Sequence, residues 1–567
     1  MIGRTCLIIL LTILSHSLFG QPFQDAVTNS IVVEKSTNVS WWAGIIEHGF
    51  QMPLADGYTA NICEKNYENQ IQPLLLSDQG DVIWSEDPFR IQFQQGSLLV
   101  ESKGGRMLRS KAGTSLREAF LYASKTYFPS SGKTPDELLF SSPQYNTWIE
   151  LMYDQNQADI LKYAKGIIDH GFPAGVLMID DNWQENYGKW DFNKGKFQDP
   201  KAMIATLHAK GFKVMLWVCP FISPDCDVYR DLASRNLLVK DNSGAPAIIR
   251  WWNGASGLLD FTNPKAVDWF RSRLDYLQST YQVDGFKFDA GDSSFYNGVT
   301  ASQPVLPNTH SELYGKIGLN YPLNEYRAMW KMGGQALGER LSDKAHSWTD
   351  LKKLVPDMIL EGLMGYPFSC PDMIGGGEFT CFLPSSSAID QELIVRSAQC
   401  QALMPMMQFS VAPWRVLDNT HLKAVLKAVK VREEHRSYIL KLVRQSALTG
   451  EPVVRSMEYV FPHQGYEQVG DQFMLGDRIL VAPVLESGTN KEVILPVGVW
   501  RGRDGKLYQG PAKFSLAVGC DELCYFEKQS GDAPHPTARD TSKPPRFGSG
   551  PATCCISHGY ENGSHLY

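Results

Sequence analysis

The feature that most constrains this fold is a repeating order of short apolar runs and longer segments of helical period, which begins near residue 143. The apolar runs 175–179, 212–218 and 285–288 alternate with the helix-like segments 200–210 and 263–280. Repeated β–α units predict a parallel sheet whose crossovers are helices, and a series this long favours a closed barrel. We therefore expect an α/β fold in which residues 143–430 form a (β/α)8 TIM barrel.

The segments on either side of this region have the pattern of β-sheet. Residues 21–142 contain short apolar runs, such as 81–84 and 89–93, between polar turns, and runs at 472–475, 478–484 and 492–495 follow the barrel. This pattern predicts an N-terminal β-sandwich over 21–142 and a C-terminal β-sandwich over 431–527. Residues 528–567 are rich in Pro, Gly, Ser and Thr, cannot bury a core, and are expected to be a disordered tail.

The N-terminus has the pattern of a secretory leader. One Arg precedes a mostly apolar run, and a cleavage point is plausible after Gly20. Residues 1–20 are therefore expected to be a signal peptide, and the mature protein to be secreted or lumenal and off the membrane; an uncleaved signal anchor is the alternative. Asn38 and Asn562 lie in glycosylation sequons. The pairing of the 11 cysteines cannot be read, although Cys520 with Cys524, or Cys370 with Cys381, could bridge.

Composition narrows the partner class. The formal net charge is -7, which argues against nucleic acid or an anionic membrane as the main partner. The 14 Trp and 23 Tyr are consistent with a carbohydrate substrate, because sugar rings stack on aromatic faces, although such residues also serve as core. No Cys/His cluster has zinc-ligand spacing, so we expect neither a metal nor another cofactor.

Polar residues stand at the ends of the predicted barrel strands, where catalytic groups of such barrels lie. Asp289 follows the run 285–288, although an Asp there could instead cap a helix or hold a loop. Asp180 and Asp181 end an earlier strand, with the structural alternative that Asp181 or Asn182 caps the next element while Asp180 alone points inward. Trp217 ends the next strand, and of Trp251 and Trp252 in the following loop one is expected to pack and the other, taken as Trp252, to form a sugar platform.

Three more polar clusters occur downstream, at 324–327, 340–343 and 366–372. Glycoside hydrolysis needs two carboxylates, a nucleophile and a group that protonates the leaving oxygen, roughly 5 Å apart in retaining enzymes. Several of these acids could be the second member.

The chain resembles the retaining α-glycosidases of glycoside hydrolase family 31, and within it the α-galactosidase-like branch of the myogenesis-regulating glycosidases. The resemblance covers residues 143–484 and rests on these motifs, in order: Ile179-Asp180-Asp181-Asn182-Trp183, Arg250-Trp251-Trp252-Asn253-Gly254, Leu259-Asp260-Phe261-Thr262-Asn263-Pro264, Phe286-Lys287-Phe288-Asp289-Ala290-Gly291, Gly365-Tyr366-Pro367-Phe368 with Pro371-Asp372-Met373, Gln408-Phe409-Ser410 with Pro413-Trp414-Arg415, and Asp471-Gln472-Phe473-Met474-Leu475-Gly476.

The resemblance implies roles for single residues. Asp289 would be the nucleophile. Asp343 is preferred as the acid/base, kept protonated by a dry setting, because it lies 372 − 343 = 29 residues before Asp372, which is the usual separation of these two aspartates in the family. Asp350 echoes a family motif but lies only 372 − 350 = 22 residues before Asp372, and it is the alternative. The resemblance places Arg327 at an arginine that contacts sugar near the acid/base, and Asp180 and Asp372 at sugar-binding carboxylates. Asp181, Trp217, Trp252 and Lys287, from the strand ends and the loop before Asp289, complete the candidate substrate-binding residues.

The family's glucosidase members carry a His after the last barrel strand, and this chain has Gln408-Phe409-Ser410-Val411-Ala412 there without one. The expected reaction is retaining hydrolysis of a terminal α-linked hexose of an oligosaccharide or glycan, with galactose favoured; an α-glucosidase or an α-xylosidase of the same family is the alternative. A non-catalytic sugar-binding protein is the alternative of a different class, and a homodimer is left open.

Overall fold

The structure is a computed structural model that describes residues 29–34, 38–63, 67–102, 104, 106–383, 386 and 388–529. The expected signal peptide lies outside the described residues, as does the expected tail from residue 530 onward. Within the described ranges, no helix has the length and apolar character needed to cross a membrane.

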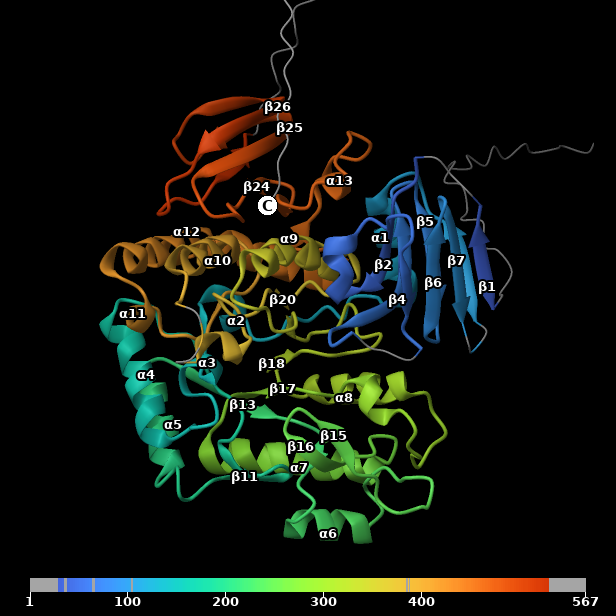
Figure 1. The fold of residues 1–567 in the computed structure, drawn as a ribbon, viewed down its shortest axis with the longest axis vertical. Coiled ribbons are helices and arrows are strands. Elements are labelled where there is room, and N and C mark those ends of the chain that lie inside the picture. The colour runs from blue at the N-terminus through green and yellow to red at the C-terminus, as the bar shows by residue number, and fades with distance from the viewer. Residues whose placement is uncertain are drawn as a thin grey trace, which may run out of the picture. The chain divides into compact units, whose positions relative to one another are not determined.

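A parallel eight-stranded sheet forms the centre of the chain (Figure 1) and confirms the predicted barrel. Its strand order is β20-β19-β18-β17-β13-β10-β9-β21, and a parallel bridge between Met373 and Gln408 brings the two outer strands together. The strands are β9 (Gln144–Asn146), β10 (Val176–Ile179), β13 (Lys213–Val218), β17 (Gly285–Phe288), β18 (Leu323–Tyr326), β19 (Glu339–Arg340), β20 (Ser369–Cys370) and β21 (Gln408–Phe409).

Helices connect most of these strands, and their first turns explain where they begin. Asp199 accepts a hydrogen bond from the Ala202 amide at the start of α5, and Asn263 accepts one from the Lys265 amide at the start of α7; such caps contribute about 1 kcal/mol each. The helices of this region are α3 (Trp148–Leu151), α4 (Gln157–Asp169), α5 (Pro200–Ala209), α6 (Asp227–Ser234), α7 (Pro264–Tyr281), α8 (Pro307–Gly318), α9 (Trp348–Leu363), α10 (Gln391–Ala402), α11 (Pro413–Val416) and α12 (Asn419–Thr449), with the 3-10 turns η2 (Ser293–Tyr296) and η3 (Phe379–Phe382).

Short antiparallel strands decorate the loops of the barrel. Two of them pair as β11 with β12, and the other three form the sheet β14-β16-β15. Their bounds are β11 (Gln184–Asn186), β12 (Lys189–Phe192), β14 (Phe221–Ile222), β15 (Ile249–Trp251) and β16 (Gly254–Leu258).

The N-terminal region is a β-sandwich, as predicted. Two four-stranded antiparallel sheets, β1-β7-β6-β3 and β2-β4-β5-β8, enclose a core to which Val100 and Ile91 contribute from one sheet and Leu75 and Ile83 from the other. Their strands are β1 (Ser30–Val33), β2 (Trp41–Ile45), β3 (Thr59–Asn61), β4 (Ile71–Ser77), β5 (Asp81–Ser85), β6 (Phe89–Gln94), β7 (Ser97–Ser102) and β8 (Met107–Lys111). Two helices, α1 (Leu116–Tyr127) and α2 (Leu138–Ser141), follow, and η1 (Ile46–Gln51) interrupts the strands.

The sandwich lies against the barrel where a crossover helix is missing. Residues 327–338, which connect β18 to β19, form no helix. Instead Ile71, at the start of β4, makes a parallel bridge with Trp330, donating to the Met329 carbonyl and accepting from the Lys331 amide. The N-terminal domain therefore covers this part of the barrel.

The C-terminal region differs from the expectation at its start. Residues 431–449 complete the 31-residue helix α12, so the expected boundary at 431 is wrong: the turns of α12 place residues such as Val431, Ile439 and Val443 on one buried face. A six-stranded sheet, β22-β23-β24-β27-β25-β26, follows. It consists of β22 (Val454–Arg455), β23 (Phe473–Leu475), β24 (Ile479–Val481), β25 (Asn490–Gly502), β26 (Leu507–Ala517) and β27 (Tyr525–Lys528), with α13 (Met457–Val460) beside β22. Lys528, the expected first tail residue, ends β27.

The cysteines of the described part are all free, including Cys520 with Cys524 and Cys370 with Cys381. The fold therefore rests on its hydrophobic cores.

Candidate active site

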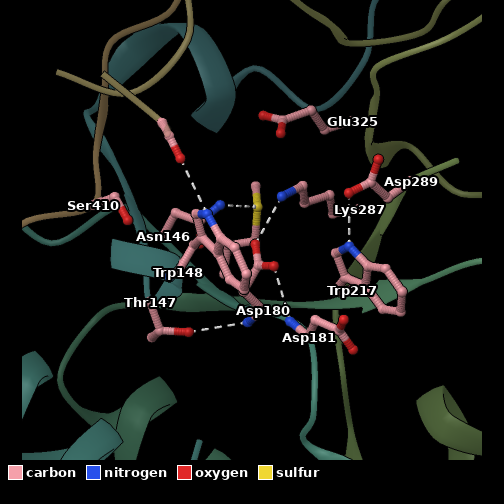
Figure 2. Close-up of polar contacts among 12 residues, drawn as sticks. Asn146, Thr147, Trp148, Asp180, Asp181, Trp217, Lys287, Asp289, Glu325 and Ser410 are labelled. Carbon is pink, nitrogen blue, oxygen red and sulfur yellow. Dashed lines mark hydrogen bonds and ion pairs between the residues drawn. The ribbon is translucent and has the colours of Figure 1, made fainter. Parts of the chain in front are cut away.

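Asp289 follows β17 directly, at the carboxyl end of the sheet, and its carboxylate is held on both oxygens. Trp217 Nε1 donates to Oδ2 at 2.9 Å (Figure 2), while Arg327 Nε and the Ala290 amide donate to Oδ1 at 3.0 and 2.8 Å. Burial by itself would raise the pKa of this carboxyl, but the charges of Arg327 and Lys287, with that of Arg340, outweigh burial and hold the pKa well below its usual range. Asp289 is thus a buried, oriented and ionised carboxylate.

Arg327 follows β18 and connects Asp289 to its surroundings. Its Nη2 donates to Asp292 Oδ2 at 2.7 Å, and its Nη1 donates to the Glu68 carbonyl of the N-terminal domain, also at 2.7 Å. The two carboxylates raise the pKa of Arg327 despite its burial. The guanidinium lies 5.3 Å from the ring centroid of Trp252, a cation–π contact.

Asp180 and Lys287 form a buried ion pair. The Lys287 Nζ to Asp180 Oδ2 distance is 2.7 Å, and both side chains are almost fully inaccessible to solvent (Figure 2). The Asp181 amide donates to Asp180 Oδ1, and the Asp180 amide donates to Thr147 Oγ1 after β9. The ion pair therefore joins the carboxyl ends of three strands, β9, β10 and β17.

Asp181 has a different environment. Its Oδ1 accepts from the Asn182 amide and Gln184, and its Oδ2 accepts from the Tyr187 hydroxyl and Asn253 Nδ2. Burial, with a smaller contribution from the neighbouring charge of Asp180, raises the pKa of Asp181 to about 7 against the effect of these hydrogen bonds. Because both oxygens have protein donors, Asp181 ties the loop after β10 to the β15–β16 turn.

Asp343 and Asp372 meet at one guanidinium. Arg340 Nη1 donates to Asp343 Oδ1 at 2.6 Å and to Asp372 Oδ1 at 2.8 Å. The Asp343 side chain is 40% exposed, which contradicts the expected dry setting, because it stands on the loop that follows the short strand β19. An added Cβ at Gly377 would lie 3.0 Å from Asp343 Oδ1 and 2.8 Å from Asp372 Oδ1, so a side chain at this position would force neighbouring side chains to shift.

Asp372 is buried and has a strongly altered acidity. Burial and, to a smaller extent, the charge of Asp343 raise its pKa to about 7 against the opposing charge of Arg340. Its Oδ2 accepts from the Lys344 amide at 2.8 Å. Glu325 on β18 is equally buried, accepts from Gln408 Nε2, and has a pKa raised by burial.

Asp350 lies elsewhere. It occupies the first turn of α9, where its Oδ2 accepts from the Ala345 amide and its Oδ1 pairs with Lys353 Nζ at 2.7 Å. Burial would raise its pKa, but these partners lower it. Both oxygens are engaged in holding the start of α9.

The three tryptophans differ in exposure. Trp217 is buried behind Asp289, and Trp251 is buried against Phe221 with ring centroids 4.2 Å apart. Trp252 is 50% exposed and rests on Arg327 and Phe295.

Four contributors had no role assigned from the sequence. Arg340 and Glu325 stood inside polar clusters that the sequence did mark, and Asp292 in the segment after Asp289. Trp148 was missed altogether: it follows the three-residue strand β9, and its Nε1 donates to the Gly377 carbonyl at 3.1 Å. If strand β9 had been recognised in the sequence, the polar residues at its end, Asn146 and Thr147, would have pointed to Trp148.

The arrangement supplies an ionised carboxylate, Asp289, and a partly exposed second carboxylate, Asp343, among buried cations at the mouth of the barrel. A nucleophile and a proton donor are what displacement at a sugar carbon requires. No group of three His, Cys, Asp or Glu side chains in the described ranges is arranged to hold a metal ion.

Comparison with known proteins agrees with this architecture. Residues 141–442 match the family model described as "Glycosyl hydrolases family 31 TIM-barrel domain", and residues 450–530 match "Glycosyl hydrolase family 31 C-terminal domain". The chain is 33% identical to the myogenesis-regulating glycosidase of Mus musculus, over 73% of this chain and 60% of that protein. It is 26% identical to the alpha-xylosidase XylQ of Lactiplantibacillus pentosus, over 80% of this chain and 61% of that protein.

Among solved structures, the GH31 dextranase FjDex31A of Flavobacterium johnsoniae, complexed with glucose, superposes with a TM-score of 0.79 at 18% identity, over 89% of this chain and 67% of that chain. The chain spans about three fifths of the length of the myogenesis-regulating glycosidase and of XylQ. On the matched barrel and C-terminal domains, the chain belongs to glycoside hydrolase family 31.

Proposed function

We propose that this chain is a retaining α-glycosidase that releases a terminal α-linked hexose, with galactose preferred. The observation that carries the proposal is the state of Asp289: a buried carboxylate that Trp217 and Arg327 orient and that surrounding cations keep ionised. A stable anion in a dry site is a nucleophile, and the ion pair with Arg327 keeps it charged at mildly acidic pH.

In the first step a carboxylate oxygen of Asp289 attacks the anomeric carbon, and the bond from that carbon to the leaving oxygen breaks. Asp343, in its protonated form, gives its proton to the leaving oxygen. In the second step Asp343 takes a proton from water, whose oxygen displaces Asp289 and restores the α-configuration. The partial exposure of Asp343 leaves it accessible to both the leaving group and the incoming water.

The hydrogen-bond and ion-pair partners of the two carboxylates favour Asp343 over Asp350 as the acid/base. Asp350 is occupied on both oxygens by α9 and the loop before it, whereas Asp343 is held by Arg340, a partner that it shares with Asp372. A group that must exchange a proton with substrate needs an accessible oxygen.

The galactose preference rests on the residues that follow β9 and β21 at the carboxyl end of the barrel. The family's glucosidase members have a His after the last strand, and here Ser410 Oγ accepts from the Ile149 amide at 2.7 Å instead. Trp148 lies beside this contact and is held through its Nε1 by Gly377. A site with different hydrogen-bonding groups rejects an epimer strongly, because the wrong hydroxyl leaves buried polar groups unpaired.

The test is to measure kcat/KM of the purified protein for the 4-nitrophenyl α-glycosides of galactose, glucose and xylose, and to follow the first-released anomer by NMR. We expect the galactoside to be preferred and α-galactose to appear first. Preference for the glucoside or xyloside would overturn the galactose assignment alone, and first release of the β-anomer would overturn the mechanism. Sugar binding without turnover of any substrate would mean a binding protein.

A further inference from the structure

A short segment of the N-terminal domain reaches the site from outside the barrel. We define the 68–70 strap as Glu68, Asn69 and Gln70, which directly precede β4. The Asn69 and Gln70 side chains are fully buried, although both are amides, and amides are buried only when they are hydrogen-bonded. Tyr67 and Glu68 both have φ near +55°, a conformation that non-glycine residues seldom adopt, so the chain is held in an unusual path as it enters the strap.

The two amides join the ends of two barrel strands. Asn69 Nδ2 donates to the carbonyls of Arg327 and Arg340 at 3.2 and 3.1 Å, and Gln70 Nε2 donates to the Tyr326 carbonyl at 3.2 Å. Tyr326 ends β18 and Arg340 ends β19, the pair of strands that lacks a crossover helix. The strap therefore takes over the bracing that a helix gives elsewhere in the barrel.

The third bond of Asn69 goes to the loop that carries the second carboxylate. The Ser342 amide donates to Asn69 Oδ1 at 3.0 Å, and Ser342 immediately precedes Asp343. The Asn69 side chain thus holds the backbone at Arg340 and at Ser342, on either side of Leu341 and just before Asp343. The Glu68 carbonyl meanwhile accepts from Arg327, which holds Asp289.

We infer that Asn69 is a positioning residue for the proton donor: it fixes the peptide before Asp343 so that the carboxyl group meets the leaving oxygen. This inference rests on the proposed function. Asp343 is 40% exposed and, among the described residues, its carboxyl group has Arg340 as its one side-chain partner, so its position depends on its backbone more than that of a buried group would. A misplacement of about 1 Å in a catalytic group can cost roughly 10²-fold in rate.

The proton donor matters most when the leaving group is poor, and this gives a specific signature. Both substrates carry the sugar that the protein hydrolyses best among the 4-nitrophenyl α-glycosides of galactose, glucose and xylose. Asn69→Ala should lower kcat/KM by about 10²-fold on a disaccharide of that sugar. It should lower kcat/KM by less than about 10-fold on the dinitrophenyl glycoside of the same sugar. Asn69→Asp keeps the acceptor for the Ser342 amide but loses the bonds that Nδ2 donates to Arg327, Arg340 and Gln70, and should lie between wild type and Asn69→Ala. Gln92→Ala, which removes an exposed amide of β6, is the matched control and should equal wild type on both substrates.

Equal losses of Asn69→Ala on both substrates would mean a merely structural role and would overturn the inference, as would unchanged rates on both. A second readout needs no turnover. In crystal structures of wild type and Asn69→Ala, the variant should show residues 341–344 displaced and the Asp343 to Arg340 contact lengthened. An unmoved loop would overturn the inference even if the chain hydrolysed no glycoside, whereas a moved loop in an inactive protein would count against the proposed function only.

Discussion

Arg340 donates from a single nitrogen, Nη1, to Asp343 at 2.6 Å and to Asp372 at 2.8 Å. The two carboxylates come from different loops, after β19 and β20, and one shared cation joins them. Asp372 is fully buried and Asp343 is partly exposed. A negative charge on Asp343 repels one on Asp372, and this repulsion adds to burial in raising the pKa of Asp372 to about 7.

Asp289→Asn should abolish turnover and leave the protein folded. The amide keeps the shape of the side chain but is no nucleophile, and Arg327 retains its partner Asp292. Kinetics on the 4-nitrophenyl glycosides, with circular dichroism for the fold, checks this. Asp268→Asn on the exposed face of α7 is the control. Normal activity of Asp289→Asn would remove Asp289 from the mechanism.

Asp343→Ala and Asp350→Ala should fail in different ways. Asp343→Ala should lose far more activity on substrates with poor leaving groups than on activated aryl glycosides, and azide should partly restore the latter by replacing the base-assisted attack of water. Asp350→Ala should lower the free energy of unfolding by about 1 kcal/mol, because the first turn of α9 loses a hydrogen-bond acceptor, with the ratio of the two activities unchanged. The reverse pattern would exchange their roles.

Glu339 on β19 and Glu361 on α9 should make the protein more stable in acid. Both are fully buried, and burial together with their mutual repulsion raises the pKa of Glu339 well above normal despite nearby backbone amides. Burial also raises the pKa of Glu361 well above normal.

The folded chain therefore keeps protons that the unfolded chain releases above about pH 4.3, so this contribution is complete below that pH and is lost as pH rises toward the folded-state pKa values. Each group costs up to about 1.4 kcal/mol per pH unit over that window. Urea unfolding between pH 5 and 8 should show falling stability, less steeply in Glu361→Gln, and the exposed Glu434→Gln on α12 should match wild type. A slope unchanged in Glu361→Gln would refute a buried neutral carboxyl.

Lys287→Met should destabilise the fold by about 3–5 kcal/mol, because it leaves the buried Asp180 carboxylate without its cation. The double variant Asp180→Asn/Lys287→Met should recover most of that loss. Thermal and urea unfolding of the four proteins forms the thermodynamic cycle. Independent, additive losses would show that the two side chains are not coupled.

Much of the fold could be predicted because strand and helix periods are local. Strand β17 begins and ends where the apolar run 285–288 predicted, and α5 and α7 start at the Pro that follows a capping residue. The strands β19, β20 and β21, of two residues each, are too short for any period to reveal. The end of α12 was misjudged because a long amphipathic helix and a β-region both contain regularly spaced apolar residues.

The sequence by itself determined the barrel, its flanking sheets and the strand-end acids from which a site could be drawn, because a carboxylate after a buried run needs only local pattern to be noticed. Tertiary structure alone decided the partners. Asn69 meets Arg340 across 271 positions and Gln408 meets Glu325 across 83, and only barrel closure brings such residues together. It also decided that Arg340 joins Asp343 to Asp372 while Asp350 holds a helix, since burial, distance and charge at these acids depend on neighbours that are remote in the chain.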